Sequence, residues 1–316
     1  MFKSTVLGLI GVANAALVWE DQFDKLDFGN WAHEITLGGG GNWEFEWYVN
    51  NRTNSYVDEG VLHLQPTLTS DQIDADYMWS STAFDIWGGE FGNQCTSNAF
   101  YGCSRAPAYS GQVLNPVKSA RMRTAGKFSF GINHKVEIRA QLPKGDWIWP
   151  AIWLLPENEE FGPWPASGEI DIMESRGNDD SCSVGGRDTF GSTLHWGIDY
   201  AHNQYEKTTQ SYTHTSDLSD DFHIYGLMWT DDGLYTYIDT PDNKVLNLDF
   251  TSESFWERAG FDAYGFDNPW RNEPNAAPFN RNFFLILNVA VGGTEGYFPD
   301  GECGRTWNDV NDFYNQ

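Results

Sequence analysis

The sequence has few basic residues and, beyond its first fifteen positions, no long apolar run. Its 316 residues include 19 Lys and Arg against 45 Asp and Glu, which gives a formal net charge of −26 at pH 7. A chain of that charge repels phosphate backbones and anionic lipid headgroups, so nucleic acids and membrane surfaces are excluded as expected partners. A membrane helix needs ~20 consecutive apolar residues, and no stretch provides them.

Aromatic residues, by contrast, are abundant. They make up 16% of the chain and include 15 Trp. Since hydrophobic residues reach 40% and charged residues only 20%, the chain can bury a sizeable core and is not expected to be disordered. A core needs only part of these rings. A ligand with flat apolar faces and no charge could use the others.

The amino terminus resembles an export signal. Lys3 precedes an apolar run at 6–12, and Ala13-Asn14-Ala15 is a small-x-small cleavage pattern. We therefore expect a signal peptide over 1–15 and a secreted, extracellular protein that begins at Ala16. The alternative is a buried first strand.

The cysteines are few and even in number. Cys95, Cys103, Cys182 and Cys303 allow three disulfide pairings in an exported protein. The first two lie in one insert rich in Gly and Asn, where a short loop closes easily, so the pairing 95–103 with 182–303 is favoured over free thiols. No CxxC or paired-His spacing occurs, and no metal site is assigned.

Short alternating runs dominate the rest of the chain. Apolar and polar residues alternate in four windows: 61–64, 127–140, 222–229 and 234–238. Gly, Asn, Asp and Pro clusters separate such runs at intervals of roughly ten residues, which is typical of an antiparallel β-sandwich. Helical periodicity is scarce, with one short helical turn expected at 252–258. We predict an all-β, single-domain fold.

Three acids fall within six residues of a strand-like segment. On a regular strand Glu169 and Asp171 share one face, whereas Glu174 points away. A β-bulge at Ile172 and Met173 returns Glu174 to that face. The two glutamates then lie roughly 13 Å apart at Cα. Leaning together, their carboxyls can reach about 5–5.5 Å, the spacing of a retaining glycosidase pair.

This spacing also bears on protonation. Two carboxylates ~5.5 Å apart repel by about 3 kcal/mol at an effective dielectric near 20, so one glutamate is expected to keep its proton near neutral pH. Asp171 lies between the two and could share a proton with Glu169. The alternative, a surface strand of solvated acids, does not explain why apolar residues alternate with them.

The motif Glu-Ile-Asp-Ile-Met-Glu at 169–174 closely resembles the active-site signature of glycoside hydrolase family 16 in its laminarinase-type form. Other matching segments follow in the family's order, at 19–31, 48–54, 57–62, 119–124, 136–140, 142–153 and 287–293. The insert that contains Cys95 and Cys103, and Asp-Asn-Pro-Trp at 267–270, suggest the invertebrate β-1,3-glucanase and glucan-recognition branch. The resemblance covers about 19–306.

The resemblance implies a concanavalin-like jelly roll with a concave substrate cleft. By position in the motif, Glu169 is the nucleophile, Asp171 the assisting acid and Glu174 the general acid/base. His195 matches a histidine on the neighbouring strand, close to the acid/base; a core histidine is the alternative. The chain ends at Gln316, before the family's final strand, which suggests a fragment.

The resemblance also implies sugar contacts along the cleft. Trp149 and Trp164 are ranked above Trp153 as stacking platforms, because alternation could also place Trp153 in the core. Two further residues, Asn50 and Arg52, resemble residues that hold sugar hydroxyls. For Arg121, a structural salt bridge competes with a ligand contact.

From these features we expect a secreted endo-β-1,3-glucanase that hydrolyses laminarin-type glucans by retaining double displacement, as a monomer and without a cofactor. The family fold can hold a structural Ca²⁺, but the sequence offers no decisive ligand set. The alternative function is a non-catalytic β-1,3-glucan receptor. Relatives of that type have lost the catalytic glutamates, which this chain keeps. Mixed-linkage glucan, agar and carrageenan remain open as substrates. The chain's negative charge disfavours sulfated galactans among them.

Overall fold

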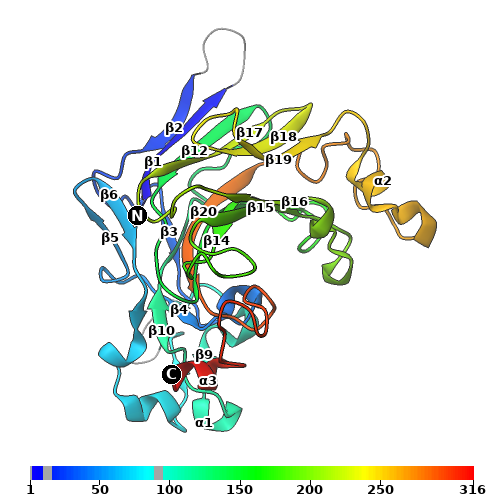
Figure 1. The fold of residues 1–316 in the computed structure, drawn as a ribbon. Helices are drawn as coiled ribbons and strands as arrows, with labels where there is room; N and C mark the ends of the chain where they lie inside the picture. The colour runs from blue at the N-terminus through cyan, green and yellow to red at the C-terminus, as the bar shows by residue number, and fades with distance from the viewer. Residues whose placement is uncertain (1, 10–15, 89–94) are drawn as a thin grey trace.

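Two packed sheets form the body of the protein. The computed structural model describes residues 2–9, 16–88 and 95–316. Figure 1 shows the two sheets as layers, with β12, β17 and β18 above β14, β15 and β20. This architecture confirms the predicted all-β sandwich. Among the described residues, no helix has the length and apolar character needed to cross a bilayer.

The seven-stranded sheet carries the candidate site. Its strands follow the order β16 (Thr209–Thr213), β15 (Thr189–His195), β14 (Glu169–Ser175), β13 (Ile148–Pro156), β20 (Phe283–Val291), β11 (Arg121–Arg123) and β3 (Ala32–Glu34). Each neighbouring pair is antiparallel. Strands far apart in sequence, such as β13 and β20, are therefore adjacent in space.

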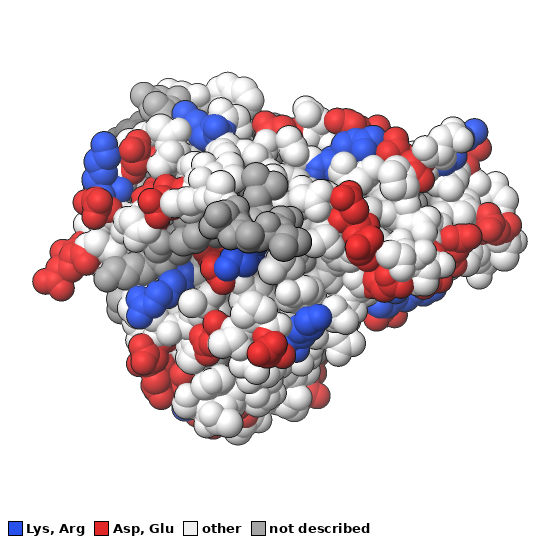
Figure 2. All heavy atoms as spheres, turned by 90° about the horizontal axis from the view of Figure 1, so that it is seen from above, with Lys and Arg blue, Asp and Glu red and all other residues white. Residues whose placement is uncertain are grey.

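The second sheet has eight strands. They are β19 (Lys244–Asp249), β18 (Gly233–Ile238), β17 (His223–Trp229), β12 (His134–Ala140), β1 (Phe2–Leu9), β6 (Val61–Leu64) and β5 (Ser55–Asp58), with β2 (Leu17–Asp21) also paired to β1. The predicted alternating windows correspond to β6, β12, β17 and β18. Figure 2 views the molecule from the side of this sheet and shows acidic and basic side chains interspersed there.

Smaller elements complete the fold. A three-stranded sheet joins β4 (Glu46–Tyr48), β10 (Val117–Ser119) and β7 (Thr67–Leu68), with β4 and β10 parallel, and a short ladder joins β8 (Phe84–Asp85) to β9 (Ser104–Arg105). The short helices are α1 (Pro107–Ser110), α2 (Phe255–Ala259) and α3 (Val310–Tyr314). Helix α2 overlaps the predicted helical turn at 252–258 and begins with a capping box between Ser254 and Glu257.

The amino-terminal segment forms a strand in the structure. Residues 2–9 make up β1, which pairs antiparallel with β12 and β2. This matches the alternative to an export signal, a first strand. The expected cleavage site at 13–15 lies outside the described residues. Cleavage after Ala15 would remove β1, so the signal peptide stays a prediction.

Both disulfides have the favoured pairing. Cys95 bonds Cys103, eight residues away, and Cys182 bonds Cys303, 121 residues away. The first lies in the insert whose residues 89–94 are outside the described part. The second ties the loop that follows β14 to the loops after β20, close to the strand with the three acids.

The main core lies between the two sheets. Its members include Ile170 and Met173 of β14, Leu287 of β20 and Trp229 of β17, all of which are 0% exposed. Because side chains alternate along a strand, the residues between these point away from the second sheet. One face of the seven-stranded sheet is therefore core, and the other is available for a ligand.

Two buried glutamates lie beside the seven-stranded sheet. Glu44 and Glu46 are 7% and 0% exposed, and Glu46 accepts a hydrogen bond from the backbone N–H of Val291 at 2.8 Å. The glycine loop ahead of them packs closely, because a Cβ on Gly39 would lie 2.7 Å from the Glu44 carbonyl oxygen. Burial raises the pKa of Glu44 to about 7 and that of Glu46 to about 8, and the charge of Glu44 adds to the rise for Glu46.

These raised pKa values predict that the protein is less stable in mild alkali than in mild acid. Unfolded glutamates ionise near pH 4.5, whereas the folded ones stay protonated up to about pH 7 and 8. The contribution of these two groups to the free energy of unfolding is therefore fully present below about pH 4.5. It is lost as the pH rises through 8, a change of several kcal/mol. Thermal unfolding from pH 4.5 to 8.5 measures it. Glu46→Gln should flatten the curve, and an unchanged slope in that variant would contradict the assignment.

Candidate active site

A β-bulge in β14 turns all three acids to one face. Against β13, Trp153 pairs with Asp171 but Ile152 pairs with Met173, so Ile172 is the extra residue. Against β15 the register shifts between Asp171 and Glu174. Ile170, Ile172 and Met173 are at most 1% exposed and belong to the core. The predicted bulge is confirmed.

His195 lies beside the first two acids. It is directly opposite Glu169 across the β14–β15 pair. Its Nε2 lies 3.3 Å from Oδ2 of Asp171 and 3.7 Å from Oε1 of Glu169. The side-chain amide of Asn203 donates to Nδ1 at 2.8 Å, which leaves Nε2–H directed at the carboxylates. His195 is half-buried at the site rather than in the core.

Glu174 is held by a stack of rings. Trp149 Nε1 donates to Oε1 of Glu174 at 2.9 Å. The Trp149 ring is 8% exposed and lies flat on Tyr297, with centroids 3.7 Å apart and planes 5° apart. Arg176 donates two hydrogen bonds to the Tyr297 carbonyl and sits 4.0 Å from the centre of its ring. The expectation that Trp149 is a sugar platform is therefore wrong, because a buried ring covered by Tyr297 orients Glu174 instead.

Trp164 sits over the first glutamate. Its Nε1 donates to Oε2 of Glu169 at 3.1 Å, and its ring is tilted against His195 at 5.5 Å between centroids. Tyr200, which is 71% exposed, lies 5.8 Å from the Trp164 ring. Tyr205 stacks on His195 at 5.3 Å. A half-buried Trp164 with Tyr200 beside it forms an aromatic rim that a sugar ring could contact.

Trp153 lies on the site face, not in the core. Its Nε1 donates to Oδ1 of Asn288 at 2.6 Å, and the guanidinium of Arg121 lies 4.6 Å from its ring centre. Arg121 also pairs with Glu34 at 2.9 Å. Of the two roles expected for Arg121, the structure shows the salt bridge. This salt bridge holds the guanidinium against the face of Trp153.

The other two predicted sugar contacts are not beside the acids. Asn50 and Arg52 are exposed and contact each other, and Arg52 donates to Oγ of Ser55 at 3.2 Å. That hydroxyl lies 2.7 Å from Nε2 of His33 on β3. Four strand spacings separate β14 from β3, roughly 19 Å. Only an oligosaccharide of several units could contact both places.

All three carboxyls are harder to ionise than in water. Burial raises the pKa of Glu169 to about 8, with the charges of Asp171 and Glu174 adding to the rise. Burial also raises the pKa of Asp171 well above its usual range. It raises the pKa of Glu174 too, while His195, the Trp149 hydrogen bond and Arg176 each act to lower it. Desolvation, rather than the charge repulsion stressed by sequence reasoning, is the larger cause. The cluster can therefore hold a proton at neutral pH, the requirement for acid catalysis.

The Trp149 bond to Glu174 leads to a test of positioning. Trp149→Phe keeps the ring on Tyr297 but removes the N–H donor. Because that donor stabilises the carboxylate, its loss should raise the pKa of Glu174 by about one pH unit and lower kcat about tenfold. The pH dependence of kcat measures the shift. A uniform loss of activity at every pH would indicate a merely structural role.

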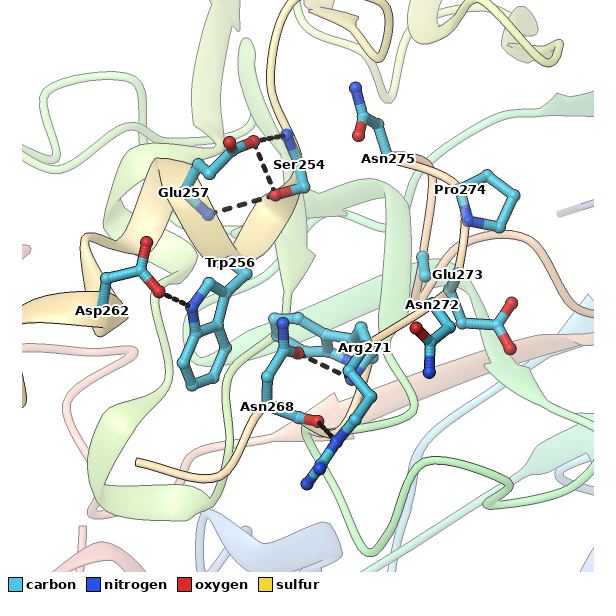
Figure 3. A pocket seen from close by; sticks show the side chains of 12 residues that line it. Ser254, Trp256, Glu257, Asp262, Asn268, Arg271, Asn272, Glu273, Pro274 and Asn275 are labelled. Carbon is cyan, nitrogen blue, oxygen red and sulfur yellow. Dashed lines mark hydrogen bonds between the residues drawn. The ribbon is translucent and has the colours of Figure 1, made fainter. Parts of the chain in front are cut away.

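The cavity lined by α2 lies away from the three acids. It has a volume of about 300 Å³ and lies between α2 and residues 268–277. Figure 3 shows its polar lining, with Trp256 directed at Asp262 and Arg271 at Asn268. Trp270, in its wall, donates to the Ala166 carbonyl and so supports the loop that carries Trp164.

Known proteins match this arrangement. The sequence profile of glycosyl hydrolases family 16 matches residues 45–254, about two thirds of the chain and all of β14. The chain belongs to glycosyl hydrolase family 16. The resemblance seen in the motif at 169–174 is thereby confirmed.

Relatives in family 16 carry two kinds of name. A "Beta-1,3-glucan-binding protein" of Penaeus monodon is 48% identical over 95% of this chain and 81% of its own length. A "Glucan endo-1,3-beta-glucosidase" of Cryptopygus antarcticus is 32% identical over 91% and 85%. Among solved structures, the endo-1,3-β-glucanase (laminarinase) catalytic domain of Thermotoga petrophila is 30% identical over 91% of each chain, with a TM-score of 0.58.

Sequence reasoning missed several residues of the family 16 site. They are Glu34, Arg176, Tyr200, Asn203, Tyr205, Asn288 and Tyr297. Most lie on loops or on strands remote in sequence, so no local pattern marks them. A metal could also be held here, since Glu169, Asp171 and His195 each place one ligand atom within 4.8 Å of the others.

Proposed function

We propose that the protein is an endo-β-1,3-glucanase that hydrolyses laminarin-type glucans with retention of configuration. The observation that carries the proposal is the bulged strand β14, which turns Glu169, Asp171 and Glu174 to one face of the sheet with a tryptophan N–H on each glutamate. A protein that only binds sugar has no use for buried carboxyls with raised pKa values. Such groups are what general acid catalysis needs near neutral pH.

The proposed reaction runs in two displacements. Glu174 gives its proton to the glycosidic oxygen while Glu169 attacks the anomeric carbon, so the bond to the leaving sugar breaks as the glucosyl ester forms. Glu174, now ionised, takes a proton from water, and that water displaces Glu169. Asp171 shares its proton with the nucleophile, and Nε2 of His195 lies near both carboxyls. The reaction as proposed uses no cofactor.

The substrate class is inferred from the aromatic side chains beside the acids, the net charge and the relatives. Trp164 lies next to Glu169 with Tyr200 beside it, and the protein's net charge of −26 suits a neutral polysaccharide better than a sulfated one. Relatives that are 30–48% identical are named for β-1,3-glucan, as binder or as glucosidase. The sheet extends roughly 19 Å from β14 to β3, a span that suits a polymer and supports internal cleavage.

A non-catalytic glucan receptor is the second candidate. One observation favours it, the name "Beta-1,3-glucan-binding protein" borne by the relative that is 48% identical. The geometry of Glu169 and Glu174 argues for hydrolysis, and the two functions separate in a single assay.

The deciding experiment follows laminarin digestion by proton NMR and by oligosaccharide profile. We expect the β anomer to form first and a mixture of short oligosaccharides to appear early. An α anomer formed first would exclude the retaining mechanism. Binding of laminarin with no release of reducing ends, by protein of normal folded stability, would establish the receptor instead.

Secretion is part of the proposal and has its own test. The amino-terminal pattern and the two disulfides support export. Expressed in cultured eukaryotic cells, the full chain should be recovered from the medium with Ala16 at its amino terminus, as read by mass spectrometry. Retention in the cells with residues 2–9 still present would contradict it.

A further inference from the structure

Three metal-binding side chains meet at the edge of the sandwich, away from the acids. His214 follows β16, the edge strand of the seven-stranded sheet, whereas His223 begins β17 and Asp239 follows β18 in the other sheet. One ring nitrogen of each histidine and one carboxylate oxygen lie within 4.8 Å of one another. Strands β15 and β16 separate this cluster, called here the rim cluster, from β14.

The backbone already positions the rim cluster. Asp239 adopts a φ of 61°, and its Oδ1 accepts the N–H of Ile224 at 3.0 Å. Its Oδ2 lies 3.0 Å from Nδ1 of His223. The backbone N–H of Ser216 donates to Nδ1 of His214 at 3.2 Å, and the two imidazole rings are edge-to-face at 4.7 Å. The groups are therefore partly ordered before any ligand binds, which lowers the cost of binding.

We propose that the rim cluster binds a divalent transition metal, with Zn²⁺ as the probe. Two imidazoles and a carboxylate are a common protein donor set for zinc, and water supplies the fourth position. Zinc bonds of 2.0–2.2 Å place neighbouring ligand atoms roughly 3.3 Å apart. The contact between His223 and Asp239 is already close to that, so only His214 has to move inward. The protein's excess of acidic groups also favours a cation.

Such a metal would join the two sheets where the sandwich is open. His214 comes from one layer and the other two ligands from the second, so the ion would bridge β16 to β17 and β18. Because β16 pairs with β15 and β15 pairs with β14, the bridge would stabilise the edge that supports His195. The expected effect is on stability, with no part in the hydrolysis. Sequence reasoning assigned no metal here because the ligands are nine and sixteen residues apart and on three elements.

The test uses untagged, full-length protein freed of metal with EDTA. Zn²⁺ titration by calorimetry should show binding at micromolar concentration or tighter, and saturation should raise Tm by roughly 5 °C. The double variant His214→Asn with His223→Gln should weaken that binding more than about 100-fold and abolish the Tm rise. His63→Gln removes an imidazole from β6, outside the cluster, and should bind as the parent does.

A second arm separates the rim cluster from the catalytic acids, which can also hold a metal. Asp171→Asn removes one ligand there and should leave the rim binding and its tetrahedral Co²⁺ absorption unchanged. Loss of that absorption in Asp171→Asn, together with its retention in the double variant, would assign the metal to the catalytic cluster and overturn the proposal. Absence of binding up to millimolar Zn²⁺ would overturn it too.

Discussion

Replacing Glu169 by Gln is expected to lower kcat on laminarin by at least about 10⁴-fold while the protein stays folded. The amide keeps the shape of the side chain but cannot attack the anomeric carbon. Stability should not fall at pH 7, because the amide carries no charge and so avoids the desolvation that raises the pKa of this carboxyl to about 8. Reducing-sugar release and thermal unfolding, measured on one preparation, separate the two effects.

Azide assigns the roles of the two glutamates. In Glu174→Ala, azide can attack the glucosyl ester on Glu169 and give a β-glucosyl azide. In Glu169→Ala it attacks the sugar directly and gives the α product. The environment raises the pKa of both groups and so does not assign the roles by itself. A β product from Glu169→Ala would reverse the assignment taken from the motif.

Asp171→Asn is a matched comparison on the same strand. It changes a neighbouring buried carboxyl to an amide but leaves both glutamates in place. We expect a smaller loss, about 10²-fold, because Asp171 acts on Glu169 and not on the sugar. A loss as large as that of Glu169→Gln would mean that Asp171 takes part directly in the reaction.

Removal of the disulfide between Cys182 and Cys303 is expected to destabilise the fold by about 5 kcal/mol. The bond closes a loop with a sequence separation of 121. Without the bond, the unfolded chain gains conformational entropy that folding must overcome, and this gain grows with the logarithm of loop length. The double variant Cys182→Ser with Cys303→Ser should show this loss in denaturant unfolding. Activity should also be lost at a lower temperature than in the parent, since the bond ties the loop that follows β14 to the loops that follow β20.

The other disulfide is the control for that prediction. Cys95 and Cys103 are only eight residues apart, so the same reasoning gives about 2.5 kcal/mol for their removal. Their loop lies in the insert, whose packing is separate from the strands of the site. Equal losses for the two double variants would show that effects on the native state, rather than chain entropy, dominate.

Sequence reasoning succeeded where the determining interaction is local. Alternation predicted β6, β12, β17 and β18, because successive side chains on a strand face opposite sides and only one side is buried. The same rule predicted the bulge, since Glu174 can share a face of the sheet with Glu169 only if the strand has one extra residue between them. The short loop between Cys95 and Cys103 favoured the right pairing by the ease of closing it.

Sequence reasoning failed where the partner is remote in the chain. Trp149 was expected to hold a sugar, but Tyr297, 148 positions later, covers its face. Arg121 could be assigned to a salt bridge only once β3 brought Glu34 beside it. The rim cluster draws on two sheets, so no spacing in the sequence announces it.

By itself, then, the sequence determined the sandwich, the strand with the three acids and the face to which they turn, because these depend on alternation and on a single inserted residue. Which neighbours hold each acid, and that burial raises their pKa values, became evident from the three-dimensional arrangement alone. Those properties depend on the pairing of β14 with β13 and β15 and on loops that fold over it. Such contacts form between residues that are neighbours in space alone.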